Sequence, residues 1–527
     1  MNDQSYRFKN KRQRRIEKQA KPGPTDDVLL TDVQSLLKSL SLANDISNHG
    51  SEPTKLPELQ SEVELTVSEI SSTGDALAYH DASGHVYVVP FAVPGDVVIA
   101  KVFKHVKDYS YSLADFVKLV EPSSRRDDSL IRCPYFSKCS GCQFQMLPYS
   151  DQLAHKKTIV EKAYRNFSGL DPHLVPSVGD TIGSPLEYGY RTKLTPHFDG
   201  PPGGRRDRRN NVKPKWSEVP PIGFMKKGTR STLDIEDCPI GTDAVRAGMK
   251  RERQRVAENI DSYLRGATLL LRENTERKPK PSGDQPADAL PGDAVVEDRG
   301  EYLHVKTCMT DSNATTTEYI DDHVFQNPAG AFFQNNNSIL PVFTQYIRDH
   351  ILPKTPASRP ITNLIDAYSG SGLFTITLSS MFKRSLGIDI SASSIASATK
   401  NARLNNLPPE HASFIAADAS DLFASITFPA DETVVVIDPP RKGCDEGFLT
   451  QLLQYSPARV VYVSCNVHTQ ARDIGALVGG MEGVDGGMGM GKGVFEIESL
   501  TGFDFFPQTG HVEGVAVLRK KSEITES

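Results

Sequence analysis

The stretch NLIDAYSGSGLF (363–374) joins a short apolar run to a turn that contains two glycines. An apolar run followed by a Gly-rich turn is typical of a strand and its loop in a parallel α/β sheet. Glycine lets such a loop pass close to a ligand, where a side chain would clash. The stretch therefore indicates a ligand-binding sheet, and the rest of the chain has to supply further evidence, because a single Gly-rich turn is weakly specific.

Four segments after this stretch repeat the alternation of an apolar strand and a loop. They are SLGIDIS (385–391), SFIAADAS (413–420), TVVVIDPPRKG (433–443) and RVVYVSCNV (459–467). Helical stretches lie between them, which predicts a parallel α/β sheet of the Rossmann-like kind. In such a sheet the carboxyl ends of the strands meet at one edge, where ligands bind. We therefore expect the residues that end these segments to lie together.

Acidic residues end two of these strands. Asp389 lies 23 residues after Asp366, at a place where a carboxylate can accept hydrogen bonds from ribose hydroxyls. Asp438 follows the apolar run VVVI, and the two prolines after it restrict the backbone. No Lys-Ser or Lys-Thr follows the glycines, which argues against a triphosphate-binding P-loop. The pattern favours a nucleoside-containing ligand, with a tight turn that binds nothing as the alternative.

Two residues near this edge are candidates for covalent and acid–base chemistry. Cys465 ends the strand RVVYVS, where nearby positive charge or a helix N-terminus would lower its pKa and make it a nucleophile. Inert packing is the alternative for a cysteine in this position. Glu513 precedes the last apolar strand, and partial burial there would raise its pKa and suit a general base. A surface acid is the alternative for Glu513.

The composition is that of a soluble globular protein, with 38% apolar residues, 24% charged residues and a formal net charge of −6. No apolar run is long enough to predict a membrane-spanning helix, and the N-terminus lacks the apolar core of a secretory signal. Seven cysteines, an odd number, favour a reducing compartment over a disulfide framework. We expect an intracellular protein, in the cytoplasm, the nucleus or the mitochondrion, without a membrane partner.

The chain is expected to have four parts. Residues 1–58 are polar and basic at the start, and predict a disordered tail with a short amphipathic helix at 28–43. Residues 59–120 alternate apolar and polar positions between turns, which predicts an OB-like β-barrel of a kind that often binds nucleic acid. Residues 121–330 predict a mixed α+β central domain with polar loops at 200–215 and 275–298, and residues 331–527 the catalytic domain.

Five motifs stand in a fixed order along the C-terminal half: FFQNNN (332–337), DAYSGSG (366–372), DPPRKG (438–443), SCN (464–466) and HVE (511–513). In this order they resemble the RNA 5-methyluridine methyltransferases. Amine methyltransferases differ, since they carry an aromatic residue after Asn/Asp-Pro-Pro and lack the downstream cysteine. The resemblance implies methyl transfer from S-adenosylmethionine to carbon 5 of a uridine. It assigns the nucleophile to Cys465 and the general base to Glu513.

The same resemblance implies which residues contact the methyl donor. They are Gln334, Tyr368, Asp389, Asp418 and Asp438. Asp418 would lie near the adenine, and Asp438 would also orient the uracil. Many relatives have Glu in place of Asp389, and the shorter acid keeps an acceptor for the ribose. The target base would have to leave its stack to reach such a pocket.

Four cysteines of the central part form a three-plus-one pattern, with Cys133, Cys139 and Cys142 close together and Cys238 distant. A structural zinc site usually has two close pairs, whereas three-plus-one is more typical of an iron–sulfur cluster. The pattern is similar to that in the cluster-bearing branch of the same family, which implies a 4Fe-4S cluster. Zinc and metal-free thiols are the alternatives.

Residues 59–120 look like a TRAM domain, the small RNA-binding barrel of this family, on the segment VVPFAVPGDVV (88–98). The favoured function is that of a tRNA (uracil(54)-C(5))-methyltransferase acting on the T-loop, with tRNA as the partner and the oligomeric state open. The same chemistry on 23S-type ribosomal RNA is the first alternative. A non-catalytic RNA-binding protein or chaperone with a methyltransferase fold is the second, which the complete set Gln334, Asp438, Cys465 and Glu513 opposes.

Overall fold

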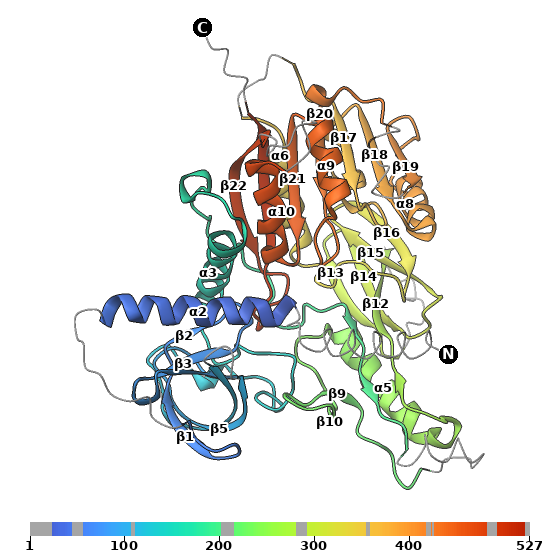
Figure 1. Cartoon of the computed structure of the whole chain (residues 1–527). Coiled ribbons are helices and arrows are strands. Elements are labelled where there is room, and N and C mark those ends of the chain that lie inside the picture. The colour runs from blue at the N-terminus through green and yellow to red at the C-terminus, as the bar shows by residue number, and fades with distance from the viewer. Residues whose placement is uncertain are drawn as a thin grey trace, which may run out of the picture. The chain divides into compact units, whose positions relative to one another are not determined.

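The computed structural model describes residues 24–44, 56–106, 111–201, 216–280, 292–354, 359–417, 423, 426–481 and 493–521. The chain divides into two compact units, residues 1–128 and residues 129–527. Among the described residues, the first unit contains an α-helix and a small sheet, and the second contains the later helices and strands (Figure 1). Across the described ranges, every helix is either too short or too polar to cross a lipid bilayer.

The first unit is a small β-barrel. Its six strands are β1 (Glu62–Thr66), β2 (Glu69–Ile70), β3 (Ala76–His80), β4 (His85–Val89), β5 (Val97–Val106) and β6 (Tyr111–Glu121). They form one sheet in the order β1-β5-β6-β4-β3-β2, in which β4 and β6 are parallel. The inner side chains include Leu65, Ala78, Tyr87, Val98 and Ala100. The predicted OB-like barrel is therefore confirmed.

Helix α2 (Pro24–Asn44) covers the outer face of this barrel. Its apolar residues Val33 and Leu36 pack with Leu77 and Val88, which point away from the interior. Because side chains alternate along a strand, the barrel has apolar residues on both faces, and α2 shields the outer set from water. The helix begins earlier than the segment 28–43 predicts. The rest of the predicted tail, apart from the residues nearest β1, lies outside the described residues.

The first part of the second unit is mixed α+β. It contains helices α3 (Tyr149–Phe167) and α5 (Asp243–Glu258) and three small antiparallel sheets. Their strands are β7 (Lys193–Leu194), β8 (His197–Phe198), β9 (Gly223–Met225), β10 (Thr232–Asp234), β11 (Ala267–Thr268), β12 (Leu271–Pro279), β13 (Val295–Arg299), β14 (Tyr302–Met309), β15 (Thr315–Ile320) and β16 (His323–Pro328). The predicted loop at 275–298 is wrong at both ends, because β12 and β13 extend into it and pair with β14. The part of β12 from Glu276 onward and the residues of β13 are exposed or half-buried, so these segments lack the apolar pattern of a core strand.

The second part is a seven-stranded sheet in the order β19-β18-β17-β20-β21-β23-β22. Its strands are β17 (Asn363–Ala367), β18 (Arg384–Asp389), β19 (Ala412–Ala416), β20 (Thr433–Ile437), β21 (Arg459–Ser464), β22 (Phe495–Phe503) and β23 (Glu513–Lys520). Strands β17–β21 are parallel, and β23 is antiparallel to both of its neighbours. This sheet confirms the predicted Rossmann-like α/β fold. Its strand order reverses between β17 and β20, and ligands bind beyond the carboxyl ends of the strands at such a point.

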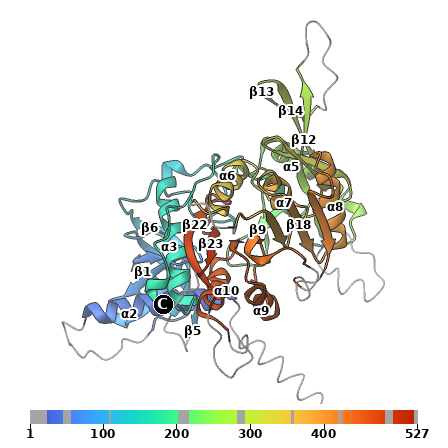
Figure 2. The same ribbon diagram turned by 90° about the horizontal axis from the view of Figure 1, so that it is seen from above.

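Helices cover both faces of this sheet (Figure 2). They are α6 (Leu340–Ile351), α7 (Leu373–Thr377), α8 (Ala392–Leu404), α9 (Glu446–Tyr455) and α10 (Val467–Gly479). On one face Ile365 and Val435 pack with α9, α10 and α3, and on the other Leu364 and Val434 pack with α6 and α7. Burial on both faces explains why these strands are continuous apolar runs rather than alternating ones.

Candidate active site

A cavity of about 960 Å³ opens at the carboxyl ends of the parallel strands. Its walls are the loops that follow β17, β18, β20 and β21, the segment before α6 and the start of β23. The predicted site residues that line it are Gln334, Tyr368, Asp389, Asp438, Cys465 and Glu513. Asp418, the remaining predicted contact, lies outside the described residues. The fold thus brings together side chains from motifs spread over almost the whole second half of the chain.

The loop after β17 leaves its backbone open to the cavity. Tyr368, Gly370 and Gly372 all have positive φ, at 65°, 53° and 90°, a conformation that a non-glycine residue such as Tyr368 adopts only when its surroundings enforce it. A Cβ atom added at Gly370 would meet nothing within 4 Å. A ligand can therefore approach the main chain at Gly370 closely.

Asp389, at the end of β18, holds this loop in place. Its Oδ2 accepts a hydrogen bond from Gly370 N at 3.0 Å, and its Oδ1 accepts one from Ser391 N at 2.8 Å. An ionised carboxylate offers about four lone-pair sites, so both oxygens keep capacity for further donors. The carboxylate is half-buried in the cavity wall and suits the hydroxyls of a ribose.

Asp438, half-buried in the cavity wall, and Asp366, fully buried, are neighbouring acids. Burial raises the pKa of Asp438 to about 7, and the charge of Asp366 adds to the rise. Burial also raises the pKa of Asp366 to about 7, although Thr375 donates two hydrogen bonds to its Oδ2. Two carboxyls that share a dry site resist double ionisation. The charge of Asp366 therefore disfavours the ionised form of Asp438.

The surroundings of Cys465 oppose its ionisation in the free protein. Burial raises the pKa of this thiol to about 11, and the charges of Glu513 and Asp438 contribute, while a hydrogen bond from Arg441 acts the other way. In the free protein the two acids and burial therefore outweigh the one cation. Glu513 is 4% exposed, and burial raises its pKa well above its usual range, with Asp438 adding to the rise and Arg441 opposing it.

Comparison with known proteins agrees with this geometry. Residues 306–521 match the family model described as tRNA (Uracil-5-)-methyltransferase. The tRNA (uracil(54)-C(5))-methyltransferase of Schizosaccharomyces pombe is 42% identical, over 96% of this chain and 85% of that protein. The enzyme of the same name from Saccharomyces cerevisiae is 39% identical, over 94% of this chain and 81% of that protein. The chain belongs to the tRNA (uracil-5-)-methyltransferase family.

A solved structure supports the same fold. The Pyrococcus abyssi tRNA (uracil-54, C5)-methyltransferase in complex with S-adenosyl-L-homocysteine matches with a TM-score of 0.59 and 22% sequence identity. The match covers 86% of this chain and all of that one. Membership of the family confirms the predicted enzyme class, a methyltransferase that uses S-adenosylmethionine.

Several residues that line the cavity were not predicted as site residues from the sequence. Arg441 belongs to the motif DPPRKG. A cation only three residues after Asp438 could have indicated that Arg441 also reaches the cavity. Arg191 and Phe506 line the same cavity, with the Arg191 guanidinium 5.4 Å from the centre of the Phe506 ring. No sequence pattern links these two residues, because they come from different parts of the second unit. His511 also lines the cavity, where its side chain is exposed. Partial desolvation of the ring, together with the charges of Arg441, Lys156 and Arg191, lowers its pKa to about 4.

Cys133, Cys139, Cys142 and Cys238, which carry the cluster pattern, are not among the residues that line this cavity. Burial raises the pKa of Cys142 to about 12, and the charges of Cys133 and Cys139 add to the rise. Cys238 interacts in the same way with the other three, so the four sulfurs share one neighbourhood. In the ranges that the structure describes, however, no three His, Cys, Asp or Glu side chains are grouped as a metal site. The predicted cluster therefore stays a prediction.

Proposed function

We propose that this protein transfers a methyl group from S-adenosylmethionine to carbon 5 of uridine 54 in the T-loop of tRNA. The observation that carries the proposal is that Cys465 and Glu513 line the same cavity as the Gly-rich loop at 366–372. The choice of tRNA rests on the names of the fungal relatives, which match the chain over most of its length. The choice of carbon 5 of a uridine as the target rests on the presence of the Cys465 thiol and the Glu513 carboxyl in one cavity.

The cavity suits the methyl donor on physical grounds. S-Adenosylmethionine supplies a methyl group bound to a positively charged sulfur. We assign the hydroxyls of the donor's ribose to Asp389, whose oxygens keep lone pairs for further hydrogen bonds. We expect the donor to approach the backbone at Gly370, where an added Cβ would meet open space. Gln334 and Tyr368 also line the cavity and are assigned further polar contacts. Asp418 remains the proposed contact near the adenine.

Cys465 and Glu513 divide the chemistry on the uracil. Cys465 loses its thiol proton to water, its Sγ bonds to carbon 6, and the electrons of the 5,6 double bond form an enolate. Carbon 5 of this enolate takes the methyl group as the bond between the methyl and the donor sulfur breaks, which leaves S-adenosylhomocysteine. Glu513 then removes the proton from carbon 5, the double bond re-forms and the thiolate leaves. The raised pKa of Glu513 makes its carboxylate a stronger base. Arg441 favours the thiolate at the first and last steps. The uridine must be extruded from its stack to reach these groups.

A Glu513→Gln variant tests this division of labour. Thiol addition and methyl transfer do not need the base, whereas elimination does. We expect turnover to fall by about 10²–10⁴, and a covalent complex with methylated RNA to appear as a slow band on a denaturing gel. The band should be absent in the Cys465→Ala, Glu513→Gln double variant. Glu496→Gln is the matched control, since Glu496 on β22 pairs with Arg519 on β23 and neither residue lines the cavity. Normal turnover in the Glu513 variant, or loss of turnover without a trapped complex, would move the base elsewhere.

The RNA substrate needs its own test. Total tRNA and ribosomal RNA from a strain that lacks the gene are incubated with the protein and a radioactive methyl donor. We expect label in tRNA at uridine 54, and mapping of the modified site checks the position. Label in ribosomal RNA alone would replace the proposed substrate with the alternative one.

We further propose that Cys133, Cys139, Cys142 and Cys238 hold a 4Fe-4S cluster. The four sulfurs interact with one another, and backbone N–H groups donate to three of them, at Phe136, Gly141 and Ile240. Such hydrogen bonds favour the thiolates that ligate iron.

We also propose that strands β1–β6 form a TRAM-like RNA-binding module and that the protein works inside the cell. The proposed domains are 59–120, 121–330 and 331–527.

A further inference from the structure

The loop between β22 and β23, residues 504–512, is buried except at Phe506 and His511, although it connects two strands. Asp504 is 0% exposed and Gln508 2% exposed. Connecting loops usually run over the surface, where water satisfies their polar groups. This one ends at Glu513, and it carries Phe506 and His511 into the cavity. Its polar atoms must therefore find partners elsewhere in the protein.

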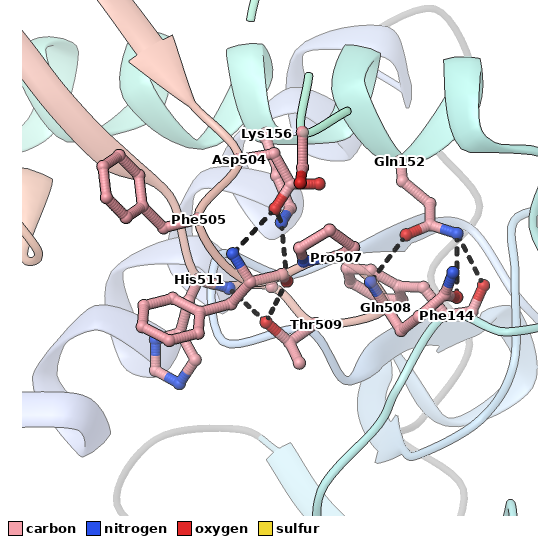
Figure 3. Close-up of polar contacts among 12 residues, drawn as sticks. Phe144, Gln152, Lys156, Asp504, Phe505, Pro507, Gln508, Thr509 and His511 are labelled. Atoms are coloured by element: carbon pink, nitrogen blue, oxygen red, sulfur yellow. Dashed lines mark hydrogen bonds and ion pairs between the residues drawn. The ribbon is translucent and has the colours of Figure 1, made fainter. Parts of the chain in front are cut away.

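Those partners come from helix α3. Lys156 and Asp504 are both fully buried and form an ion pair across a separation of 348 residues in sequence (Figure 3). The Lys156 ammonium also donates to Phe506 O at 3.1 Å. Asp504 Oδ1 in turn accepts from Phe506 N at 3.0 Å. One charged pair thus holds both polar backbone atoms of Phe506.

A second contact lies one helical turn earlier on α3. Gln152 donates to the Gln508 side chain at 3.1 Å and accepts from Gln508 N at 3.0 Å (Figure 3). Gln508 has a φ of 72°, a left-handed conformation that costs free energy in a non-glycine residue. Residues four apart on a helix lie on the same face, so Gln152 and Lys156 hold the loop from one side.

Hydrogen bonds within the loop connect this attachment to the cavity. Thr509 Oγ1 donates to Phe506 O at 2.8 Å and accepts from His511 N at 3.3 Å. Glu513 follows two residues after His511. A movement of Phe506 is therefore passed to His511 and to the start of β23.

We propose that Lys156 and Asp504 are positioning residues that set the place of Glu513 relative to Cys465. The inference rests on the proposed function, since it takes Glu513 as the base. A buried ion pair adds little net stability compared with apolar residues of similar size, but its directed contacts define one geometry. Displacement of a catalytic group by about 1 Å can cost on the order of 10² in rate. Loosening the loop should therefore affect proton removal more than addition of the thiol.

The decisive variant removes both charges. Lys156→Met alone leaves Asp504 buried without a counter-ion and should lower the melting temperature. Lys156→Met with Asp504→Asn avoids the unpaired charge, and the Asn oxygen can still accept from Phe506 N. We expect this double variant to melt close to the wild type. Its kcat should fall by about 10- to 100-fold, while the KM for RNA changes less than about two-fold.

The two halves of the reaction are read separately. A labelled methyl donor reports methyl transfer into a covalent complex, and tritium at carbon 5 of the uridine reports proton removal. In the double variant the covalent complex should accumulate while tritium release lags. The matched control is Lys157→Met with Asp180→Asn, which removes the neighbouring solvent-exposed pair and should leave both signals unchanged. Thr509→Val keeps the ion pair but removes the hydrogen bonds of Thr509 Oγ1 with Phe506 O and His511 N. If the double variant does not fold, the same two signals are measured in this variant.

The outcomes separate this inference from the proposed function. A double variant with wild-type kcat and tritium release would overturn the positioning role and leave the ion pair a structural feature. A fall in kcat without a trapped complex, matched by a rise in the KM for RNA, would overturn it as well. Failure of the proposed function looks different. In that case the wild type itself would release no tritium, or Glu513→Gln would trap no complex.

Discussion

At the scale of single residues, Cys465 sits where its thiolate is disfavoured until a substrate arrives. Burial and the two nearby acids raise its pKa to about 11. Only the thiolate is alkylated, so a raised pKa means slow alkylation at neutral pH. We expect the alkylation rate of Cys465 by iodoacetamide to rise about tenfold per pH unit from pH 7 to 9, without a plateau. Mass spectrometry of the Cys465 peptide measures the rate, and a plateau below pH 8 would contradict the raised pKa.

Charge substitutions around this thiol should shift the profile in opposite directions. Arg441→Met removes the cation that stabilises the thiolate, so alkylation of Cys465 at pH 8 should slow. Asp438→Asn removes a negative charge that opposes the thiolate, so alkylation should accelerate. If both variants are alkylated at the rate of the wild type, burial alone sets the pKa of Cys465.

Loss of the nucleophile should separate binding from chemistry. In Cys465→Ala no other group can add to carbon 6, so methylation should be abolished. Binding of the methyl donor should survive, because its proposed contacts Asp389 and Gly370 belong to the loops after β18 and β17. Calorimetry with S-adenosylhomocysteine measures that binding. Near-normal turnover in this variant would end the covalent mechanism.

At the scale of elements, helix α2 stabilises the barrel by covering its outer apolar face. Val33 is fully buried against the outer face of the barrel, whereas the next residue, Gln34, is exposed. Val33→Ala removes two methyl groups and should destabilise the first unit by about 1–2 kcal/mol. Faster amide hydrogen exchange in β3 and β4 is the measurement. Gln34→Ala, the matched control, should leave exchange unchanged.

The same helix changes how an N-terminal deletion should be designed. Removal of residues 1–23 takes away the basic run at 9–21 and leaves α2 in place. We expect unchanged catalysis on short RNA, and RNA binding with a smaller salt dependence if the basic run touches phosphates. Removal of residues 1–44 should in addition expose the outer apolar face and lower the stability of the barrel. Equal stability of the two truncated proteins would contradict the role of α2.

At the scale of the whole molecule, distant parts of the chain assemble both proposed centres. Cys238 approaches Cys133, Cys139 and Cys142 only in the folded second unit. Protein purified without oxygen should therefore be brown and contain iron, and Cys238→Ser should lose most of it. Cys308→Ser, at a buried position outside the four-cysteine pattern, is the control. Zinc in place of iron would refute the cluster.

The Rossmann-like sheet and the proposed site residues at its edge could be predicted from local sequence patterns. A strand, a Gly-rich turn and a helix are local patterns, and the carboxyl ends of parallel strands necessarily share an edge. Asp389, Asp438 and Cys465 could therefore be placed together from their positions after apolar runs. The barrel could also be predicted from local patterns, because its short strands alternate apolar and polar residues.

Only the tertiary structure decided the energetics around these residues. The raised pKa of Cys465 depends on how deeply it is buried and on which charges face it, and neither follows from spacing along the chain. The attachment of the 504–512 loop to Lys156 joins residues 348 positions apart, and the cover of α2 over β3 and β4 depends on which face of each strand is left open. Local patterns specify elements, whereas contacts between elements specify the charges, burial and geometry that chemistry requires.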